Sequence, residues 1–129
     1  MNVYVRIFDE TGKKVLMVLN KSSRGPEYNY WSFPGGGWNE DKETLVEAAL
    51  RELLEETGLV ADVGSEVAKM PSDGEFTSLC FEGKNLRDAI NAPPRDPDIL
   101  DIDWVDRRFV ISGDPLWGFH KRAPIQRFH

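Results

Sequence analysis

Hydrophobic residues along this chain follow two repeats, one at every second residue and one at every third or fourth residue. Alternation of apolar and polar residues is typical of a strand with one buried face, whereas a short uninterrupted apolar run is typical of a strand covered on both faces. The run from Val15 to Leu19 is of the second kind and predicts a central strand. The whole pattern predicts strands near residues 3–8, 14–19, 29–33, 60–70, 75–81 and 99–105.

One segment carries the helical repeat. Its apolar stripe is formed by Leu45, Ala48, Ala49, Leu50, Leu53 and Leu54. A stripe of this kind predicts a helix that packs one side on the core. Asn39 or Asp41 is expected to cap the start of this helix, and Gly58 to end it in the left-handed conformation.

The other side of this helix is acidic, because Glu52, Glu55 and Glu56 are spaced three and four residues apart. Like charges at this spacing cost about 0.2–0.5 kcal/mol per pair, and a hard divalent cation would turn the repulsion into attraction. For these three residues alone, a solvated acidic face is the simpler interpretation. The chain ahead favours a site, because the aromatic segment 31–33 is followed by Pro34 and three glycines. We therefore expect a strand that feeds a loop whose backbone can approach a ligand or metal.

The residues around this helix also match a known motif. Gly37 is followed by Glu43 and then by the run Arg51-Glu52-Leu53-Leu54-Glu55-Glu56-Thr57-Gly58-Leu59. This arrangement resembles the Nudix box, G-x5-E-x7-R-E-U-x-E-E-x-G-U, where U is aliphatic, and every specified position is matched. The resemblance implies a MutT-like Nudix hydrolase with an α/β fold, a mixed sheet sandwiched between helices in an α/β/α sandwich. Such enzymes hydrolyse a nucleoside diphosphate linked to another group, X.

The resemblance also implies roles for individual residues. It implies Mg²⁺ as the cofactor, with Mn²⁺ as the alternative, bound by Glu52, Glu55 and Glu56. A backbone carbonyl of Gly36 or Gly37 completes the coordination in many members. Glu43 and Arg51 are then expected to support the metal ligands from behind.

The charge distribution agrees with a metal site. The window from Gly37 to Leu59 contains seven acidic and two basic residues, so it holds five of the six net negative charges of the chain. Water attacks a phosphoanhydride only when the negative phosphate oxygens are neutralised. Carboxylates repel such a substrate by themselves, and they become useful by holding divalent cations. An anionic substrate is therefore expected to approach this window through metal.

The general base is left between two candidates. Glu55 on the helix is one, and the acid-rich segment 96–104 contains the other, since Asp96 and Asp98 come just before an alternating strand. The resemblance implies that a carboxylate of this loop binds metal or activates water, and Asp98 is our candidate for that role. Ordinary solvated aspartates in a proline-rich turn are the alternative.

Residues outside the box are expected to select the substrate. Lys21 and Arg24 lie in a polar loop and are candidates to bind phosphate, while Trp38, Tyr28 or Tyr30 could stack on a base. For Tyr30 we favour a place in the core. The terminal segment 117–122 combines aromatic rings with positive charge, in a second helix expected to begin with Asp114 as its cap. Patterns that mark ADP-ribose and dinucleoside polyphosphate hydrolases downstream of the box are absent, which favours a nucleoside triphosphate.

Length and composition limit the remaining alternatives. The 129 residues, 40% of them hydrophobic, predict a single domain over residues 1–129, and no apolar run is long enough to cross a membrane. The only cysteine, Cys80, is expected to be a packed core thiol, and a reducing cytoplasm is the expected location. The acidic pI, near 4.9, argues against binding nucleic acid polymers and leaves a small nucleotide as the expected partner.

Three function classes and one question of assembly follow from these observations. The first class is a pyrophosphohydrolase, with ADP-ribose or dinucleoside polyphosphate as alternative substrates. The second is a Nudix-fold sensor that binds nucleotides without catalysis, and the third is an isomerase of isoprenoid diphosphates. The complete set of box carboxylates favours the hydrolase. A homodimer is left open as the assembly.

Overall fold

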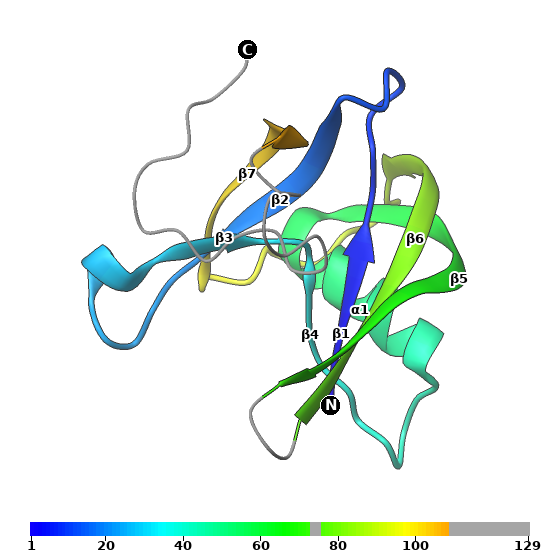
Figure 1. The fold of residues 1–129 in the computed structure, drawn as a ribbon, viewed down its shortest axis with the longest axis horizontal. Helices are drawn as coiled ribbons and strands as arrows, with labels where there is room; N and C mark the ends of the chain where they lie inside the picture. Colours follow the sequence, from blue (N-terminus) through cyan, green and yellow to red (C-terminus); the bar gives the residue numbers. More distant parts are fainter. Residues whose placement is uncertain (73–75, 109–129) are drawn as a thin grey trace.

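The computed structural model describes residues 1–72 and 76–108, which form two sheets and one α-helix (Figure 1). The four-stranded sheet has the order β4 (Gly35–Gly37), β1 (Asn2–Arg6), β6 (Phe76–Asp88) and β5 (Leu59–Ser72). The three-stranded sheet has the order β3 (Tyr30–Ser32), β2 (Lys14–Asn20) and β7 (Ile99–Asp106). Strands β1 and β6 run parallel, and the other neighbours run antiparallel. The predicted strands and the mixed sheet are therefore confirmed.

The predicted central strand is β2, which lies between β3 and β7. Its residues Val15, Leu16, Met17 and Val18 are all buried, because both faces of the strand are covered. A tight turn joins β1 to β2, and Gly12 takes a φ of 73° there. The long strands β5 and β6 form a hairpin in which β5 is the edge strand of the four-stranded sheet and curves along its length (Figure 1).

The glycines after Pro34 form a strand, which corrects the predicted loop. Strand β4 pairs antiparallel with β1 and places Gly35 opposite Tyr4 and Gly36 opposite Val3. A Cβ atom on Gly35 would overlap the carbonyl oxygen of Val3, so only glycine allows this close approach. The glycine run therefore serves strand pairing as well as backbone freedom.

Helix α1 (Leu45–Thr57) begins later than predicted. Its N-cap is Thr44, whose hydroxyl accepts from the backbone N–H of Glu47 while the Glu47 carboxylate accepts from the N–H of Thr44. The expectation that Asn39 or Asp41 caps the helix is wrong, because the Asn39 carbonyl accepts from the N–H groups of Lys42 and Glu43 in a separate turn. The end is as predicted, since Gly58 has a φ of 75° and donates to the Leu54 carbonyl.

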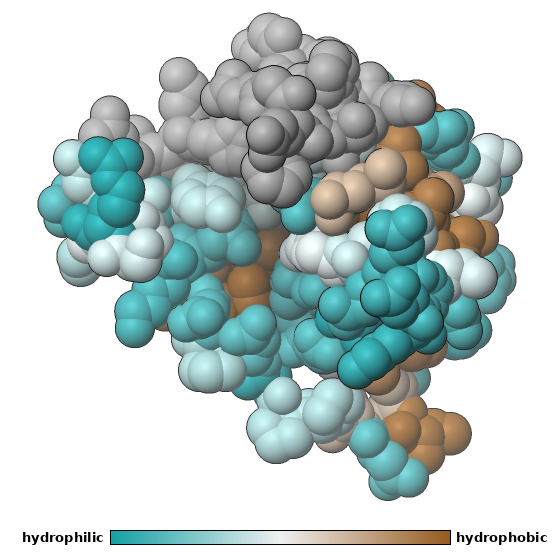
Figure 2. Space-filling view, turned by 90° about the horizontal axis from the view of Figure 1, so that it is seen from below, coloured by the Kyte–Doolittle hydropathy of each residue, from teal (hydrophilic) through white to brown (hydrophobic). Residues whose placement is uncertain are grey.

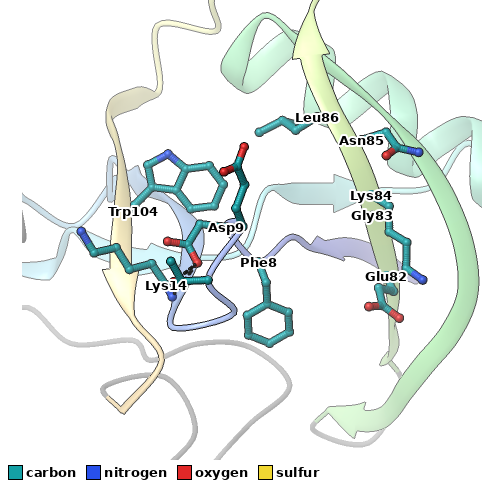
Figure 3. A pocket seen from close by; sticks show the side chains of 11 residues that line it. Phe8, Asp9, Lys14, Glu82, Gly83, Lys84, Asn85, Leu86 and Trp104 are labelled. Carbon is teal, nitrogen blue, oxygen red and sulfur yellow. Dashed lines mark hydrogen bonds between the residues drawn. The ribbon is translucent and has the colours of Figure 1, made fainter.

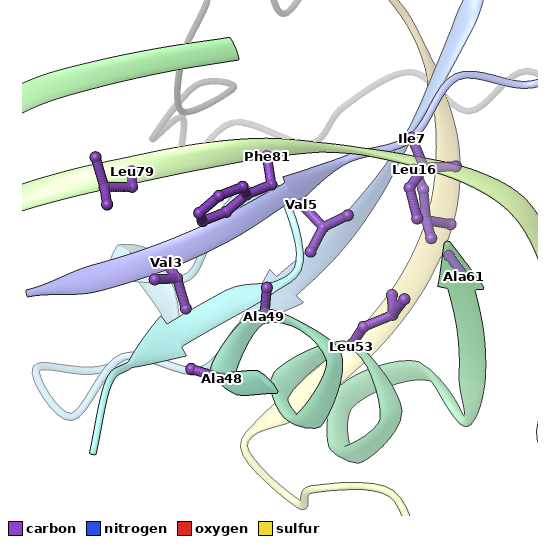
Figure 4. Close-up of a cluster of buried hydrophobic side chains, with 10 residues drawn as sticks. All are labelled: Val3, Val5, Ile7, Leu16, Ala48, Ala49, Leu53, Ala61, Leu79 and Phe81. Atoms are coloured by element: carbon purple, nitrogen blue, oxygen red, sulfur yellow. The ribbon is translucent and has the colours of Figure 1, made fainter. Parts of the chain in front are cut away.

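Helix α1 packs against the first of two buried clusters. Ala48, Ala49 and Leu53 face side chains of the four-stranded sheet and of β2 (Figure 4). The other buried members of this first cluster are Ile7, which directly follows β1, and the strand residues Val3, Val5, Leu16, Ala61, Leu79 and Phe81. Because Leu45, Ala48, Ala49 and Leu53 of the apolar stripe make this contact, the acidic side of the helix is turned away from the cluster.

The second cluster lies on the opposite face of β1 and joins both sheets. Its buried members are Val15, Met17, Trp31, Phe33, Cys80 and Val105. Cys80 is a free, buried thiol, as predicted, and burial raises its pKa to about 12. Tyr4 and Phe8 of the β1 segment pack against this second cluster.

The described surface is mainly hydrophilic on the face shown in Figure 2, with small hydrophobic patches. Three large hydrophobic side chains, Met1, Ile90 and Leu100, are exposed among the described residues. Within that part of the chain, no helix has the length and apolar character to span a membrane. The predicted second helix and the segment 117–122 lie outside the described residues.

Candidate functional site

The acidic side of helix α1 places its glutamates against strand β4. Glu56 is only 4% exposed, and its Oε1 accepts a hydrogen bond from the Gly35 N–H at 3.1 Å. The Glu52 side chain is 13% exposed, whereas that of Glu55 is 42% exposed. Within about one turn of helix, the exposure of these side chains thus increases from Glu56 through Glu52 to Glu55.

Burial makes Glu56 an unusual carboxyl group. Burial is the main cause that raises the pKa of Glu56 well above its ordinary value, and a hydrogen bond with the Glu52 carboxyl and the charge of nearby Asp96 raise it further. The hydrogen bond from Gly35 opposes this shift. Two carboxyl groups that share a hydrogen bond at neutral pH need a proton or a cation between them.

Arg51 ties the acidic residues together. Its Nη2 donates to Glu43 Oε1 at 2.8 Å and to the Gly37 carbonyl at 2.9 Å, and its Nε donates to both oxygens of the Glu43 carboxylate. Its Nη1 contacts Glu52 at 3.0 Å and Glu55 at 3.5 Å. The hydrogen bond from Arg51 lowers the pKa of Glu43, and in return Glu43 raises the pKa of Arg51. Sequence reasoning expected Glu43 and Arg51 to support the set, and the structure brings both to it.

Among residues 1–72 and 76–108, no group of three or more Asp, Glu, His or Cys side chains has its atoms gathered around one point suitable for a metal ion. In this structure Glu52 and Glu55 contact the Arg51 guanidinium, at 3.0 Å and 3.5 Å. The donors nevertheless fit a hard cation, since they are oxygens only. A divalent ion would also supply positive charge to the buried Glu56, which takes part in no ion pair among the described residues, whereas Glu52 already contacts Arg51.

The absence of a side chain at Gly36 leaves room for a carboxylate. A Cβ atom at this position would stand 2.8 Å from both carboxylate oxygens of Glu52, whereas a Cβ atom on Gly37 would meet nothing within 4 Å. Gly36 therefore borders the Glu52 carboxylate directly. The carbonyl of Gly37 is occupied by the hydrogen bond from Arg51, so of the two glycines predicted as metal ligands Gly36 has the more direct relation to the glutamates.

Comparison with known proteins decides the family. The sequence matches the family profile of the NUDIX domain over residues 1–125, nearly its whole length. The chain belongs to the Nudix family. Nudix hydrolases are pyrophosphohydrolases that act on phosphoanhydrides, and they generally use divalent metal ions.

Individual relatives agree with this assignment. The chain is 39% identical over 59 residues to human Nucleoside diphosphate-linked moiety X motif 6, an alignment that covers 46% of this chain and 17% of that protein. It is 51% identical over 41 residues to the RNA pyrophosphohydrolase of Erythrobacter litoralis, which covers 32% of this chain and 24% of that protein. The chain thus spans less than a quarter of the length of these relatives.

A solved structure confirms the expected fold class. The MutT protein from Methanosarcina mazei has a TM-score of 0.62 and 22% identity to this chain, over 89% of this chain and 82% of that one. At this identity the likeness shows the fold, with its mixed sheets and helix. The α/β Nudix fold predicted from the box is therefore confirmed.

The loop before β7 distinguishes the two aspartates proposed as alternatives to Glu55. The Asp96 N–H donates to the Glu55 carbonyl at 2.9 Å, and the Asp96 charge reaches Glu56. Asp98 is exposed, and its carbonyl accepts from the Lys21 N–H at 2.8 Å. The structure thus brings Asp96 close to Glu55 and Glu56. The backbone of Asp98, our candidate from the sequence, instead contacts the backbone of Lys21.

The residues predicted to bind substrate are scattered in the described structure. Arg24 is exposed and stacks on Tyr28, with its Cζ 4.3 Å from the ring centroid. Trp38 packs against the first cluster, and its indole N–H donates to the Glu43 carbonyl at 2.9 Å. The contacts of Trp38 thus hold the segment between β4 and helix α1 in place. Lys21 and Arg24, in an exposed loop, remain candidates to bind substrate.

Sequence reasoning missed Tyr4. Tyr4 lies opposite Gly35, whose N–H donates to Glu56, so its ring is close to Glu56. Burial raises the pKa of Tyr4 to about 12, and the charges of Tyr30, Glu56 and Glu52 add to the shift. The alternation of β1 contained the signal, because Tyr4 lies on the opposite face from Val3 and Val5. Recognising which face meets the site required the pairing of β1 with β4.

A cavity of about 710 Å³ lies apart from the Nudix glutamates. Trp104 and Lys14 form one wall, and Glu82, Lys84 and Asn85 of β6 form the facing wall (Figure 3). Its size is suitable for a small molecule, yet none of the predicted site residues is among those that line it. The cavity is therefore separate from the glutamates that the sequence predicts as the site.

Proposed function

We propose that this protein is a Nudix pyrophosphohydrolase that uses Mg²⁺, or Mn²⁺, to cleave the phosphoanhydride of a nucleoside diphosphate linked to another group. The observation that carries the proposal is the Glu52–Glu56 carboxyl pair against β4, in which Glu52 contacts Arg51 while the buried Glu56 has no ion pair among the described residues, with Glu55 one turn from Glu52 on the exposed side. Glu52, Glu55, Glu56 and the carbonyl of Gly36 would hold the metal. When bound, it would neutralise phosphate oxygens and acidify a water.

The remaining steps belong to residues of the chain. Arg51 fixes the orientation of Glu52 and Glu55 through its Nη1 and is itself anchored by Glu43 and the Gly37 carbonyl. Glu55 is the general base that we favour, because its carboxylate is the most accessible of the three and can accept a proton from the attacking water. Asp96 is the second candidate, because it is bonded to the backbone of Glu55.

For the substrate, we propose a nucleoside triphosphate or a related small nucleotide. This choice is supported by the MutT-like fold and by the absence of the downstream patterns of other Nudix classes. ADP-ribose and dinucleoside polyphosphates remain the alternatives. A sensor without catalysis is disfavoured because Glu52, Glu55 and Glu56 are all present and all contact the proposed site.

The test replaces one carboxylate without changing its shape. In Glu55→Gln we expect Mg²⁺-dependent hydrolysis to fall by about a hundredfold or more, because a metal ligand or general base is lost. The measurement is product release from a panel of nucleoside triphosphates, nucleotide sugars and dinucleotides. The matched control is Glu40→Gln, the same change at an exposed residue ahead of the helix.

Each outcome of this panel has a clear meaning. Hydrolysis in Glu55→Gln at the level of the unchanged protein would contradict the assignment of the site. If the unchanged protein binds one panel compound tightly and hydrolyses none, the sensor replaces the hydrolase. Circular dichroism of both variants checks that the fold is kept.

A further inference from the structure

The two faces of strand β1 meet different surroundings. Val3, Val5 and Ile7 point into the first cluster beneath helix α1 (Figure 4). Because side chains alternate along a strand, Tyr4, Arg6 and Phe8 share the other face. Tyr4 and Phe8 pack against the second cluster, and Arg6 lies between them in the chain.

One end of this second face reaches the candidate metal site. Tyr4 lies opposite Gly35, the residue whose N–H donates to Glu56. A Cβ atom on Gly35 would collide with the Tyr4 ring, so that ring lies directly against the backbone that holds the Glu56 carboxyl. Arg6 follows two residues later, about 6.6 Å further along the strand.

Arg6 is a cation with unused donor capacity on this face. Its Nε is buried and has no hydrogen-bond partner among the described residues. Its guanidinium lies 5.1 Å from the Phe8 ring centroid, and the ion pairs of the described chain involve Arg51, Arg87 and Arg108 instead. Glu82 is opposite Arg6 in the parallel pairing, yet the two form no ion pair within 4.0 Å.

A buried arginine donor without an acceptor is costly unless a ligand supplies the acceptor. Planar guanidinium groups match phosphate oxygens in geometry and charge. The candidate metal site would bind the diphosphate of the substrate, and Arg6 stands on the same strand face, one strand repeat beyond Tyr4. A substrate that contacts both the metal site and Arg6 would therefore carry a second anionic group, away from the bond that is cleaved.

We propose that Arg6 binds a second phosphate of the substrate, a phosphate monoester separated from the scissile anhydride by about the length of a nucleoside. The proposal rests on the proposed function, because the metal site defines where the diphosphate lies. It makes Arg6 a specificity-determining residue. Among nucleoside diphosphate derivatives, those with an additional phosphate on the nucleoside are then preferred over the same compounds without it.

Two pairs of compounds that differ by one such phosphate test this proposal. NADPH and coenzyme A carry it, whereas NADH and dephospho-coenzyme A lack it. We expect the unchanged protein to bind the phosphorylated member of each pair about tenfold to a hundredfold more tightly, as for a charge-assisted hydrogen bond. Arg6→Gln should reduce this ratio to near one and leave affinity for the unphosphorylated members unchanged. Isothermal titration calorimetry gives the four dissociation constants without requiring turnover.

Two further variants keep the test decisive. Arg6→Lys retains the charge and should retain part of the preference, which also covers the case in which Arg6→Gln folds poorly. Arg87→Gln is the matched control, because Arg87 is an exposed arginine of β6 paired with Asp62 at 3.4 Å. Its preference should equal that of the unchanged protein.

The remaining outcomes overturn the proposal. They are equal affinity for both members of each pair, binding of none of the four compounds, or a preference that survives in Arg6→Gln. The last result would mean that Arg6 only packs on Phe8. Failure of the proposed function is recognised separately, by Mg²⁺-dependent hydrolysis that persists in Glu55→Gln.

Discussion

Arg51 shows how a single side chain prepares an acidic cluster. Its guanidinium contacts Glu43, Glu52 and Glu55 and also holds the Gly37 carbonyl. Without a cation, carboxylates one turn apart repel each other. Arginine keeps its charge at any ordinary pH, so it can hold these side chains together before a metal arrives. Glu56 is the exception, because it lies too deep in the protein for Arg51 and pairs with Glu52 instead.

A first prediction concerns the contact between Gly36 and Glu52. Gly36→Ala would place a Cβ atom 2.8 Å from the Glu52 carboxylate, which must swing away because it is the movable partner. We expect Mg²⁺-dependent activity to fall by about tenfold or more, while the free energy of unfolding changes by less than about 1 kcal/mol. Enzyme assays over a range of Mg²⁺ concentrations and denaturant titrations measure the two quantities.

The neighbouring glycine is the matched control for this prediction. Gly37→Ala adds the same methyl group where nothing lies within 4 Å. Its activity should stay within about twofold of the unchanged protein. Equal losses in the two variants would show that the glycine backbone matters generally and that the Glu52 contact has no special role.

The sequence predicts the site residues unevenly, for a physical reason. Spacing along one helix places Glu52, Glu55 and Glu56 together whatever the rest of the fold does, so this group is predictable. Asp96 approaches the helix only through the loop before β7, and Tyr4 does so only through the pairing of β1 with β4. Contacts of this kind depend on topology, which a local pattern does not contain.

At the scale of elements, the start of helix α1 depends on the capping box of Thr44 and Glu47. Thr44→Ala removes the hydroxyl that accepts from the Glu47 N–H and should lower the free energy of unfolding by about 1 kcal/mol. Asp41→Ala should change it by less than about 0.5 kcal/mol, because Asp41 is an exposed residue outside the helix. Urea titrations of both variants measure the difference, and a larger loss in Asp41→Ala would return the cap to the position expected from the sequence.

The error in the predicted cap and the missed strand β4 have related causes. Asn39, Asp41 and Thr44 are all good capping residues, and the choice among them was made by the reciprocal bonds that only Thr44 and Glu47 can form. Three consecutive glycines carry no alternation, so the pattern that reveals β1 and β2 is silent at β4. The longer strands were predictable because their apolar positions repeat.

At the scale of the whole molecule, the two buried clusters share their strands. Strands β1, β2 and β6 each contribute side chains to both clusters, on opposite faces. Helix α1 contacts the first cluster, and Cys80 lies in the second. Since neither cluster can lose these strands without exposing the other, we expect the chain to unfold as one unit. That residues 1–129 form a single domain stays a prediction, and cooperative unfolding would test it.

Cys80 offers a direct measurement of that cooperativity, because it is the only cysteine and is fully buried. A thiol reagent should label it only when the protein opens. Leu53→Ala, in helix α1, should cost about 2–5 kcal/mol, so a single cooperative unit predicts that Cys80 is labelled roughly thirtyfold to several thousandfold faster in this variant. Glu40→Gln, an exposed change, should leave the rate unaltered. A different result would contradict the single unit. If circular dichroism shows that Leu53→Ala lowers the free energy of unfolding while the labelling rate of Cys80 stays constant, the two clusters open independently. The shared strands would then keep Cys80 buried without help from helix α1.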